Sequence, residues 1–201
     1  MNPTAMLRAF CDAVEQRNGK AFAALFTEDG VYHDVFYGAF AGRTAMNATA
    51  LLRAFCDAVE QHNGKAFADL FTEDGVYHDV FYGAFAGRAK IAEMIDDWFY
   101  RTATDFRWDM HAPVSDGHTL YARYTFSYRS TLPEAKGARA MFEGVAIMKL
   151  RDEGIAEYHE VANTAPAFVE LNFAPERIAR IVAKQGAELK ARPEMARHLV
   201  E

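Results

Sequence analysis

Apolar side chains recur at helical spacing in four stretches of the chain. Over 49–61 leucine, phenylalanine, cysteine and valine residues share one face, and a second, shorter helix is predicted over 65–71. Isoleucine, methionine and tryptophan form one apolar stripe over 89–100. A last helix is predicted over 175–190, because a proline at its start suits the first helical turn.

Elsewhere the hydrophobic period changes to two, which indicates strands. Because strands follow helices instead of alternating with them, the pattern predicts an α+β fold. We expect a cone: a strongly curved antiparallel or mixed sheet wrapped around the N-terminal helices (a cystatin-like α+β barrel), with a further C-terminal helix. The opening of such a cone is a natural small-molecule pocket. Strands are predicted over 76–79, 81–86, 105–112, 119–129, 138–150 and 155–163.

The N-terminal segment occurs twice. Met1–Arg43 and Met46–Arg88 align over 43 positions with four differences, so 39 positions are identical. In a structural repeat array the hydrophobic pattern is kept, the surface residues differ between repeats, and more than two copies are needed. We therefore interpret the repeat as a recent or engineered duplication with its seam at Thr44–Ala45.

Three regions follow from this interpretation. Residues 1–45 form an extra arm, 46–170 form the functional domain, and 171–201 form a C-terminal helical extension. Because the copies are nearly interchangeable, the first could dock in place of the second.

Composition narrows the classes of function. The 201 residues are 51% hydrophobic and 13% aromatic, which is enough for a sizeable core. The net charge of −6 argues against nucleic acid or an anionic membrane surface as partner. Two cysteines, Cys11 and Cys56, make no disulfide framework, and no stretch is apolar enough to span a membrane. We expect a reducing, cytoplasmic setting.

Several segments together resemble a known superfamily. LRAFCDAVEQHNGKAFADLF at 52–71, TEDGVYHD at 72–79, the residues 83–88 and KLRDEGIAEYHEVAN at 149–163 resemble the nuclear transport factor 2-like superfamily. The likeness is to its SnoaL-like and limonene epoxide hydrolase-like members and covers about 49–170. Because this superfamily hosts isomerases, hydrolases, dehydratases, cyclases and binding proteins, the resemblance implies a fold more than a substrate.

Individual members suggest roles for three residues. Asp79 falls where ketosteroid isomerases carry a proton-shuttling aspartate and epoxide hydrolases a water-holding asparagine. Glu160 falls where those hydrolases keep a catalytic aspartate, and Tyr77 matches one of their pocket tyrosines. The departures are as informative. Tyr124 and Phe126 replace the hydrolase's arginine and second aspartate.

Two further departures remove other known chemistries. Phe55 and Ala146 stand where the isomerase has its oxyanion-hole tyrosine and protonated aspartate. The His–Asp dyad of scytalone dehydratase and dehydrochlorinase is also absent at matching places. None of these mechanisms transfers intact.

Strand periodicity predicts which side chains share the pocket. If Tyr77 and Asp79 point inward, Tyr124 and Glu160 do so as well, and we propose these four as catalytic. Carboxylates in such an apolar wall have raised pKa values that suit general acid–base chemistry. The residues expected to contact substrate are Phe55, Phe81, Trp98, Arg101, Arg107, His111, Phe126, Phe142 and Tyr158.

Each assignment has a plainer alternative. Asp79 could be a solvated turn residue at a strand end, and Glu160 a surface residue. In the expected register His78 and His159 face away from the pocket. A slip of one residue would instead place His159 and Asn163 in the pocket in place of Glu160.

Three cationic residues are further candidates for the site. Arg107 and His111 lie on the polar face of the strand 105–112, which could face an acidic or phenolic substrate or a subunit contact. Arg101 lies at the expected pocket mouth.

Metal and cofactor binding find little support. His78-Asp79 and His159-Glu160 are adjacent pairs whose side chains alternate faces, so neither pair can chelate one ion from a regular strand. No HExxH, glycine-rich phosphate loop or GxSxG elbow occurs. The sequence therefore predicts a site without metal or cofactor.

The residues favour a cofactor-independent lyase, isomerase or cyclase acting on a hydrophobic, aromatic or polyketide-like molecule, by retro-aldol, dehydration or cyclisation chemistry. A non-catalytic binding module with the same cone is the alternative. So is an engineered duplication or domain-swapped molecule whose pocket is incidental. Apolar area on the sheet and last helix favours a homo-oligomer, either a dimer or a trimer.

Overall fold

The computed structural model describes residues 3–27, 30–34, 38–41, 48–152 and 154–200. The chain divides into two compact units, Met1–Ala48 and Thr49–Glu201. The proposed seam at Thr44–Ala45 lies outside the described residues. No helix among the described residues is long and apolar enough to cross a membrane.

The first unit contains two helices and a two-stranded antiparallel sheet. The side-chain oxygen of Asn18 caps the second helix by accepting a hydrogen bond from the Ala21 amide at 3.0 Å. In chain order the elements are α1 (Pro3–Glu15), α2 (Gly19–Ala23), β1 (Val31–Asp34) and β2 (Gly38–Ala41).

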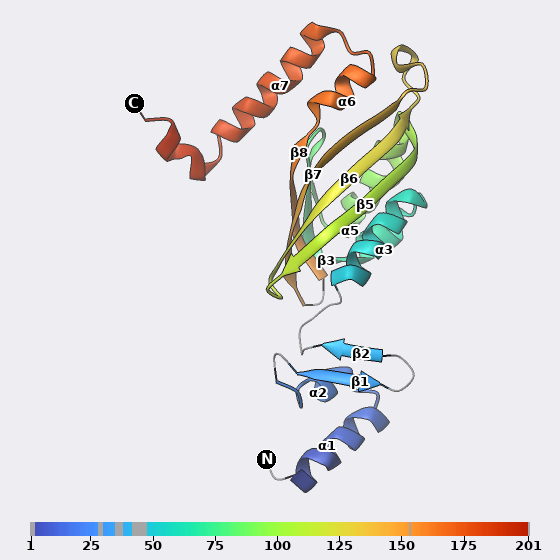
Figure 1. Ribbon diagram of the computed structural model, residues 1–201, viewed down its shortest axis with the longest axis vertical. Coiled ribbons are helices and arrows are strands. Elements are labelled where there is room, and N and C mark those ends of the chain that lie inside the picture. Colours follow the sequence, from blue (N-terminus) through green and yellow to red (C-terminus); the bar gives the residue numbers. More distant parts are fainter. Residues whose placement is uncertain (1–2, 28–29, 35–37, 42–47, 153, 201) are drawn as a thin grey trace. The chain divides into compact units, whose positions relative to one another are not determined.

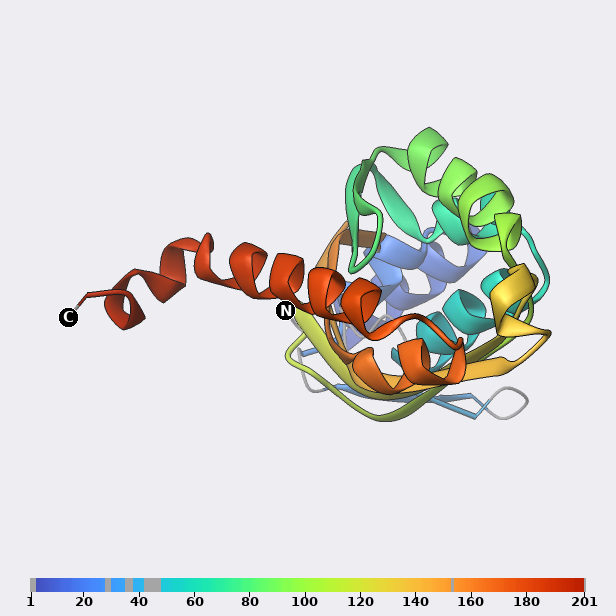
Figure 2. The same cartoon turned by 90° about the horizontal axis from the view of Figure 1, so that it is seen from above.

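The second unit is built on a six-stranded sheet (Figure 1). Its strand order is β4-β3-β8-β7-β6-β5, and β3 runs parallel to β8 while the other neighbours are antiparallel. Figure 2 shows the strong curvature of this sheet, with α3 on its inner side. The strands are β3 (Phe71–Asp79), β4 (Gly83–Ala86), β5 (Ala103–Ser115), β6 (Thr119–Ser130), β7 (Arg139–Arg151) and β8 (Gly154–Asn163).

Helices complete this unit. The first helix of this unit, α3 (Ala48–Glu60), has one buried stripe, whose side chains are 5% exposed or less. The stripe consists of Leu51, Leu52, Phe55 and Val59. The helices are α3 (Ala48–Glu60), α4 (Gly64–Asp69), α5 (Arg88–Glu93), α6 (Ala165–Glu170) and α7 (Pro175–Lys190), followed by a 3₁₀ turn at Pro193–His198. The expected α+β cone is thereby confirmed.

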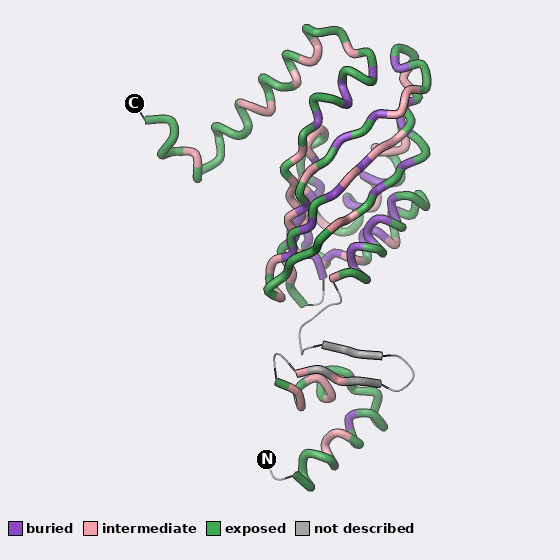
Figure 3. Tube along the Cα trace, in the orientation of Figure 1, coloured by how far each residue is buried: buried purple, intermediate pink, exposed green. Residues whose placement is uncertain are grey.

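The two copies of the repeated segment form the same order of elements but differ in burial (Figure 3). Leu7 is 67% exposed in α1, whereas its counterpart Leu52 is 3% exposed in α3. The reason is that β3 of the second copy pairs with β8, while β1 of the first copy pairs with β2 in a separate sheet. The second copy therefore completes the cone.

The structure differs from the sequence prediction in three places. Strand β3 begins at Phe71 instead of residue 76, because a bulge before Val76 absorbs the intervening turn-like residues. The helix predicted over 89–100 is α5 followed by a π-helical turn at Met94–Trp98 and a 3₁₀ turn at Phe99–Arg101. Helix α6 was not predicted.

Candidate active site

An aromatic chamber lies inside the cone and has a volume of about 70 Å³ accessible to water. Seven of the residues expected in the pocket line this chamber. They are Tyr77, Asp79, Phe81, Tyr124, Phe126, Phe142 and Glu160.

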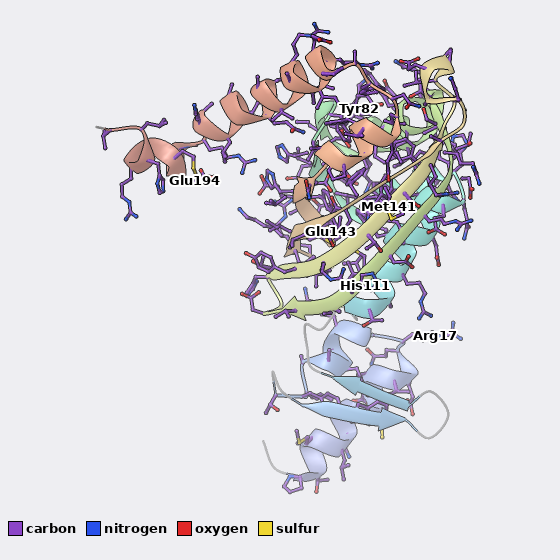
Figure 4. All side chains as sticks on the ribbon, turned by 45° about the horizontal axis from the view of Figure 1, so that its top comes forward. Arg17, Tyr82, His111, Met141, Glu143 and Glu194 are labelled. Carbon is purple, nitrogen blue, oxygen red and sulfur yellow. The ribbon has the colours of Figure 1, made fainter. Side chains whose placement is uncertain are left out.

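The register of the sheet explains this grouping. Along β7 the side chains of Met141 and Glu143 are exposed on the outer face (Figure 4), while Phe142 between them lines the chamber. On β8, Glu160 lines the chamber and His159 lies on the other face in a pair with Glu157. The register with Glu160 inside is therefore the one that the chain adopts.

Asp79 lies at the end of β3 and is only 9% exposed. Its Oδ1 accepts hydrogen bonds from the backbone amides of Phe81 and Tyr82, each at 2.8 Å. Burial raises the pKa of the Asp79 carboxyl to about 6, although both hydrogen bonds oppose this shift. The side chain is thus both a turn-forming residue and part of the chamber wall.

Glu160 is held by two phenol groups. Its Oε2 accepts hydrogen bonds from the hydroxyl of Tyr124 at 2.6 Å and of Tyr158 at 3.2 Å. Burial, and secondly the charge of Asp79, raise the pKa of the Glu160 carboxyl to about 8, while the two phenols lower it. The two carboxyl groups therefore have pKa values on opposite sides of neutrality.

Tyrosine packing positions these groups. The rings of Tyr77 and Tyr158 stack with their centroids 4.3 Å apart, and both side chains are fully buried. Burial raises the pKa of both phenols well above the ordinary range. The Tyr124 hydroxyl passes close to Gly144 on β7. A Cβ at Gly144 would lie only 2.6 Å from this hydroxyl oxygen. Glycine at this position leaves room for the hydrogen bond to Glu160.

Seven further residues line the chamber beside those seven. Trp108 is the most informative: its indole Nε1 is buried and has no hydrogen-bond partner among the described residues. The alternating large apolar side chains of β5 are the sequence signal that groups Phe106 and Trp108 on one face. The seven further residues are Tyr82, Phe99, Thr102, Ala103, Phe106, Trp108 and Tyr128.

Six residues expected to contact the substrate do not line the chamber. Because the aromatic face of β5 points inward, Arg107 and His111 lie on the opposite face. The side chain of Arg107 is 66% exposed, and His111 hydrogen-bonds to Thr125 (Figure 4). The expectation that either reaches the chamber is wrong.

The other four are placed by packing. Trp98 packs against Phe85, and the guanidinium carbon of Arg101 lies 4.7 Å from the Trp98 ring centroid. Phe55 is fully buried in the core under Tyr158. Tyr158 itself lies behind the chamber wall and acts on it through its hydrogen bond to Glu160.

The curved sheet thus encloses two carboxyl groups in an aromatic chamber. A family model described as a SnoaL-like domain matches residues 52–158, more than half of the chain. The chain belongs to this family. A search of the curated proteins found no match.

Solved structures share the fold at low sequence identity. A hypothetical protein with a ketosteroid isomerase-like fold from Catenulispora acidiphila, in complex with trimethylamine, is 17% identical with a TM-score of 0.54, covering 62% of this chain and 97% of its own. A putative polyketide cyclase from Xanthomonas campestris is 20% identical (TM-score 0.53; 64% and 98% covered). A limonene epoxide hydrolase-like (LEH-like) enzyme from M. tuberculosis is 17% identical (TM-score 0.51; 68% and 96% covered).

Proposed function

We propose that the protein is a cofactor-independent lyase, isomerase or cyclase that acts on a small hydrophobic molecule bearing a carbonyl or hydroxyl group. The observation that carries this proposal is the pair Asp79 and Glu160 on one chamber wall, with pKa values of about 6 and about 8. Solved structures of the same fold include a putative polyketide cyclase and an epoxide hydrolase, which supports an enzyme of this general kind.

The two pKa values assign the roles. Between about 6 and about 8, Asp79 is ionised and can accept a proton, while Glu160 is protonated and can donate one. Below this window the base is lost, and above it the acid is lost. The rate should therefore follow a bell-shaped pH profile.

The reaction step balances with these groups alone. Asp79 takes a proton from carbon next to a carbonyl, the C–H bond breaks, and its electron pair moves onto the carbonyl oxygen. Glu160 then delivers its proton to another carbon of the enolate as the carbonyl reforms, and a proton passes from Asp79 to Glu160 to restore both groups. The buried N–H of Trp108 has no partner in the described part of the chain, and a substrate oxygen would supply one.

The chamber limits substrate size. Its volume of about 70 Å³ lies well below the roughly 300 Å³ at which ordinary ligand pockets begin. We therefore favour a monocyclic substrate over a polycyclic one, with part of the ring at the mouth. Tyr82 lines the chamber and is 45% exposed, so its rotation can widen the entrance.

The experiment is deuterium exchange into enolisable monocyclic ketones, with acetophenone and cyclohex-2-enone as probes, followed by ¹H NMR. We expect catalysed α-proton exchange that is lost in Asp79→Asn and retained in His118→Gln, an exposed control. Quenching of tryptophan fluorescence measures binding separately and should persist in Asp79→Asn. Equal exchange in Asp79→Asn and wild type would refute the assignment. Binding without exchange in the wild type would instead favour the ligand-binding module.

A further inference from the structure

Three side chains gather on the outer face of the sheet, directly behind the chamber. His78 precedes Asp79 on β3, and Glu157 and His159 flank Tyr158 on β8. The imidazole rings of His78 and His159 stack with their centroids 3.9 Å apart. One nitrogen or oxygen atom from each of the three side chains lies within 4.8 Å of the other two. The parallel pairing of β3 with β8 brings them together from distant parts of the sequence.

The spacing of the donor atoms suits one metal ion. Glu157 Oε1 lies 2.9 Å from His159 Nε2 and 3.5 Å from His78 Nε2. A tetrahedral ion with bonds of about 2.1 Å separates its ligand atoms by about 3.4 Å. The two measured distances lie on either side of this value. The three side chains are 33% to 43% exposed, so an ion can enter and small rotations can bring the imidazoles into place.

The surrounding charges leave the donors available. Lys149 pairs with the other carboxylate oxygen, Oε2 of Glu157, at 3.2 Å, so Oε1 stays directed at the histidines. From α7, Lys184 and Glu188 line the same groove and pair with each other at 3.6 Å.

We propose that His78, Glu157 and His159 bind one divalent transition metal of the kind that prefers imidazole, such as Zn²⁺, with the remaining position open to water. Two histidines and a glutamate are a ligand set that zinc takes in proteins. The ion would link β3 to β8, the junction at which the second copy of the repeated segment joins the rest of the sheet.

The sequence alone does not reveal this site. Adjacent residues along one strand point to opposite faces, so neither His78-Asp79 nor His159-Glu160 can hold one ion. The three ligands instead come from two strands whose parallel pairing is not visible in either strand alone.

The test is a Zn²⁺ titration of the full chain, free of any histidine tag and stripped of metal, in competition with the fluorescent indicator mag-fura-2. We expect one equivalent of Zn²⁺ to bind. His78→Gln and His159→Gln should each weaken binding by at least about 10-fold, the lower end of what even outer-shell partners of a bound metal contribute. Near-UV circular dichroism confirms that each variant is folded.

The duplicated segment provides a matched control. His33 occupies the position of His78 in the first copy, within the same four residues VYHD, but its strand β1 has β2 as its partner. His33→Gln should leave the bound equivalent unchanged. The proposal is overturned if the wild type binds no equivalent, if His78→Gln and His159→Gln bind as tightly as the wild type, or if His33→Gln removes the bound ion.

Thermal unfolding, monitored by tryptophan fluorescence, gives a second readout. Zn²⁺ should raise the Tm of the wild type and leave the Tm of His159→Gln unchanged. An equal rise in both proteins would also contradict the proposed link between β3 and β8. Neither readout depends on the reaction in the chamber.

Discussion

Replacing Asp79 with asparagine should stabilise the second unit at neutral pH. The Asp79 carboxyl has its pKa raised from 3.8 to about 6 because burial disfavours its charged form. About 2 units at roughly 1.36 kcal/mol each amount to about 3 kcal/mol. Asparagine removes the charge, and its Oδ1 can still accept the hydrogen bonds from the Phe81 and Tyr82 amides.

The sign of the pH dependence follows from the direction of this shift. Because the folded state holds the proton more tightly than the unfolded state, the stability linked to Asp79 is fully present below pH 3.8. It is lost as the pH rises through about 6. The unfolding free energy of the wild type should therefore fall over this range by about 3 kcal/mol relative to Asp79→Asn.

Urea unfolding followed by tryptophan fluorescence measures this difference. Both tryptophans of the chain, Trp98 and Trp108, lie in the second unit, so the signal reports on that unit alone. We expect the variant and wild type to be similar near pH 4 and to diverge in favour of the variant by neutral pH.

Asp116 offers a matched control. Its Oδ1 also accepts hydrogen bonds from the amides two and three positions on, His118 and Thr119, but the residue is exposed and these bonds lower its pKa. Asp116→Asn should not stabilise the protein at neutral pH. The reasoning fails if Asp79→Asn gives the same difference at both pH values, or is less stable than wild type at neutral pH.

Three further outcomes are expected. Tyr124→Phe removes the hydrogen bond that lowers the pKa of Glu160, so the alkaline limb of the exchange-rate profile should move to higher pH. If this limb does not move, Glu160 is not the acid that it reports. Gly144→Ala places a Cβ 2.5 Å from a backbone carbonyl oxygen and 2.6 Å from the Tyr124 hydroxyl, and should cost about 1–3 kcal/mol in urea unfolding. Leu52→Ala should cost about 2–5 kcal/mol, whereas Leu7→Ala should stay within about 0.5 kcal/mol; equal costs would contradict the burial difference between the copies.

Most elements of the second unit could be predicted because their hydrophobic periods are local. The stripe on α3 and the alternation on β6, β7 and β8 both appear in the sequence and in the burial of the side chains. The same alternation placed Glu160 on the inner face. The local hydrophobic period could not show where α5 ends, because a π-helical turn follows it. This turn contains Asp96, whose Oδ1 accepts a hydrogen bond from the amide of Gly64 in α4 at 2.8 Å, a contact between distant parts of the sequence.

The site was less predictable because it depends on contacts between strands. On β5 the period was visible, but the choice between its two faces had to come from packing, and Arg107 lies outside as a result. The outer cluster of His78 and His159 depends on the same kind of long-range pairing. A sequence shows which side chains share a strand face, and the fold decides which faces meet.

The parallel pairing of β3 with β8 also has a kinetic consequence. Asp79 and Glu160 stand about 80 positions apart in the chain and meet only when this pairing closes the cone. Contacts of such high sequence separation are slow to form, because the loop entropy is lost before the contact is gained. Partly folded chains with intact hairpins β5–β6 and β6–β7 would therefore lack the proposed acid–base pair, and only fully folded molecules would show the proposed activity.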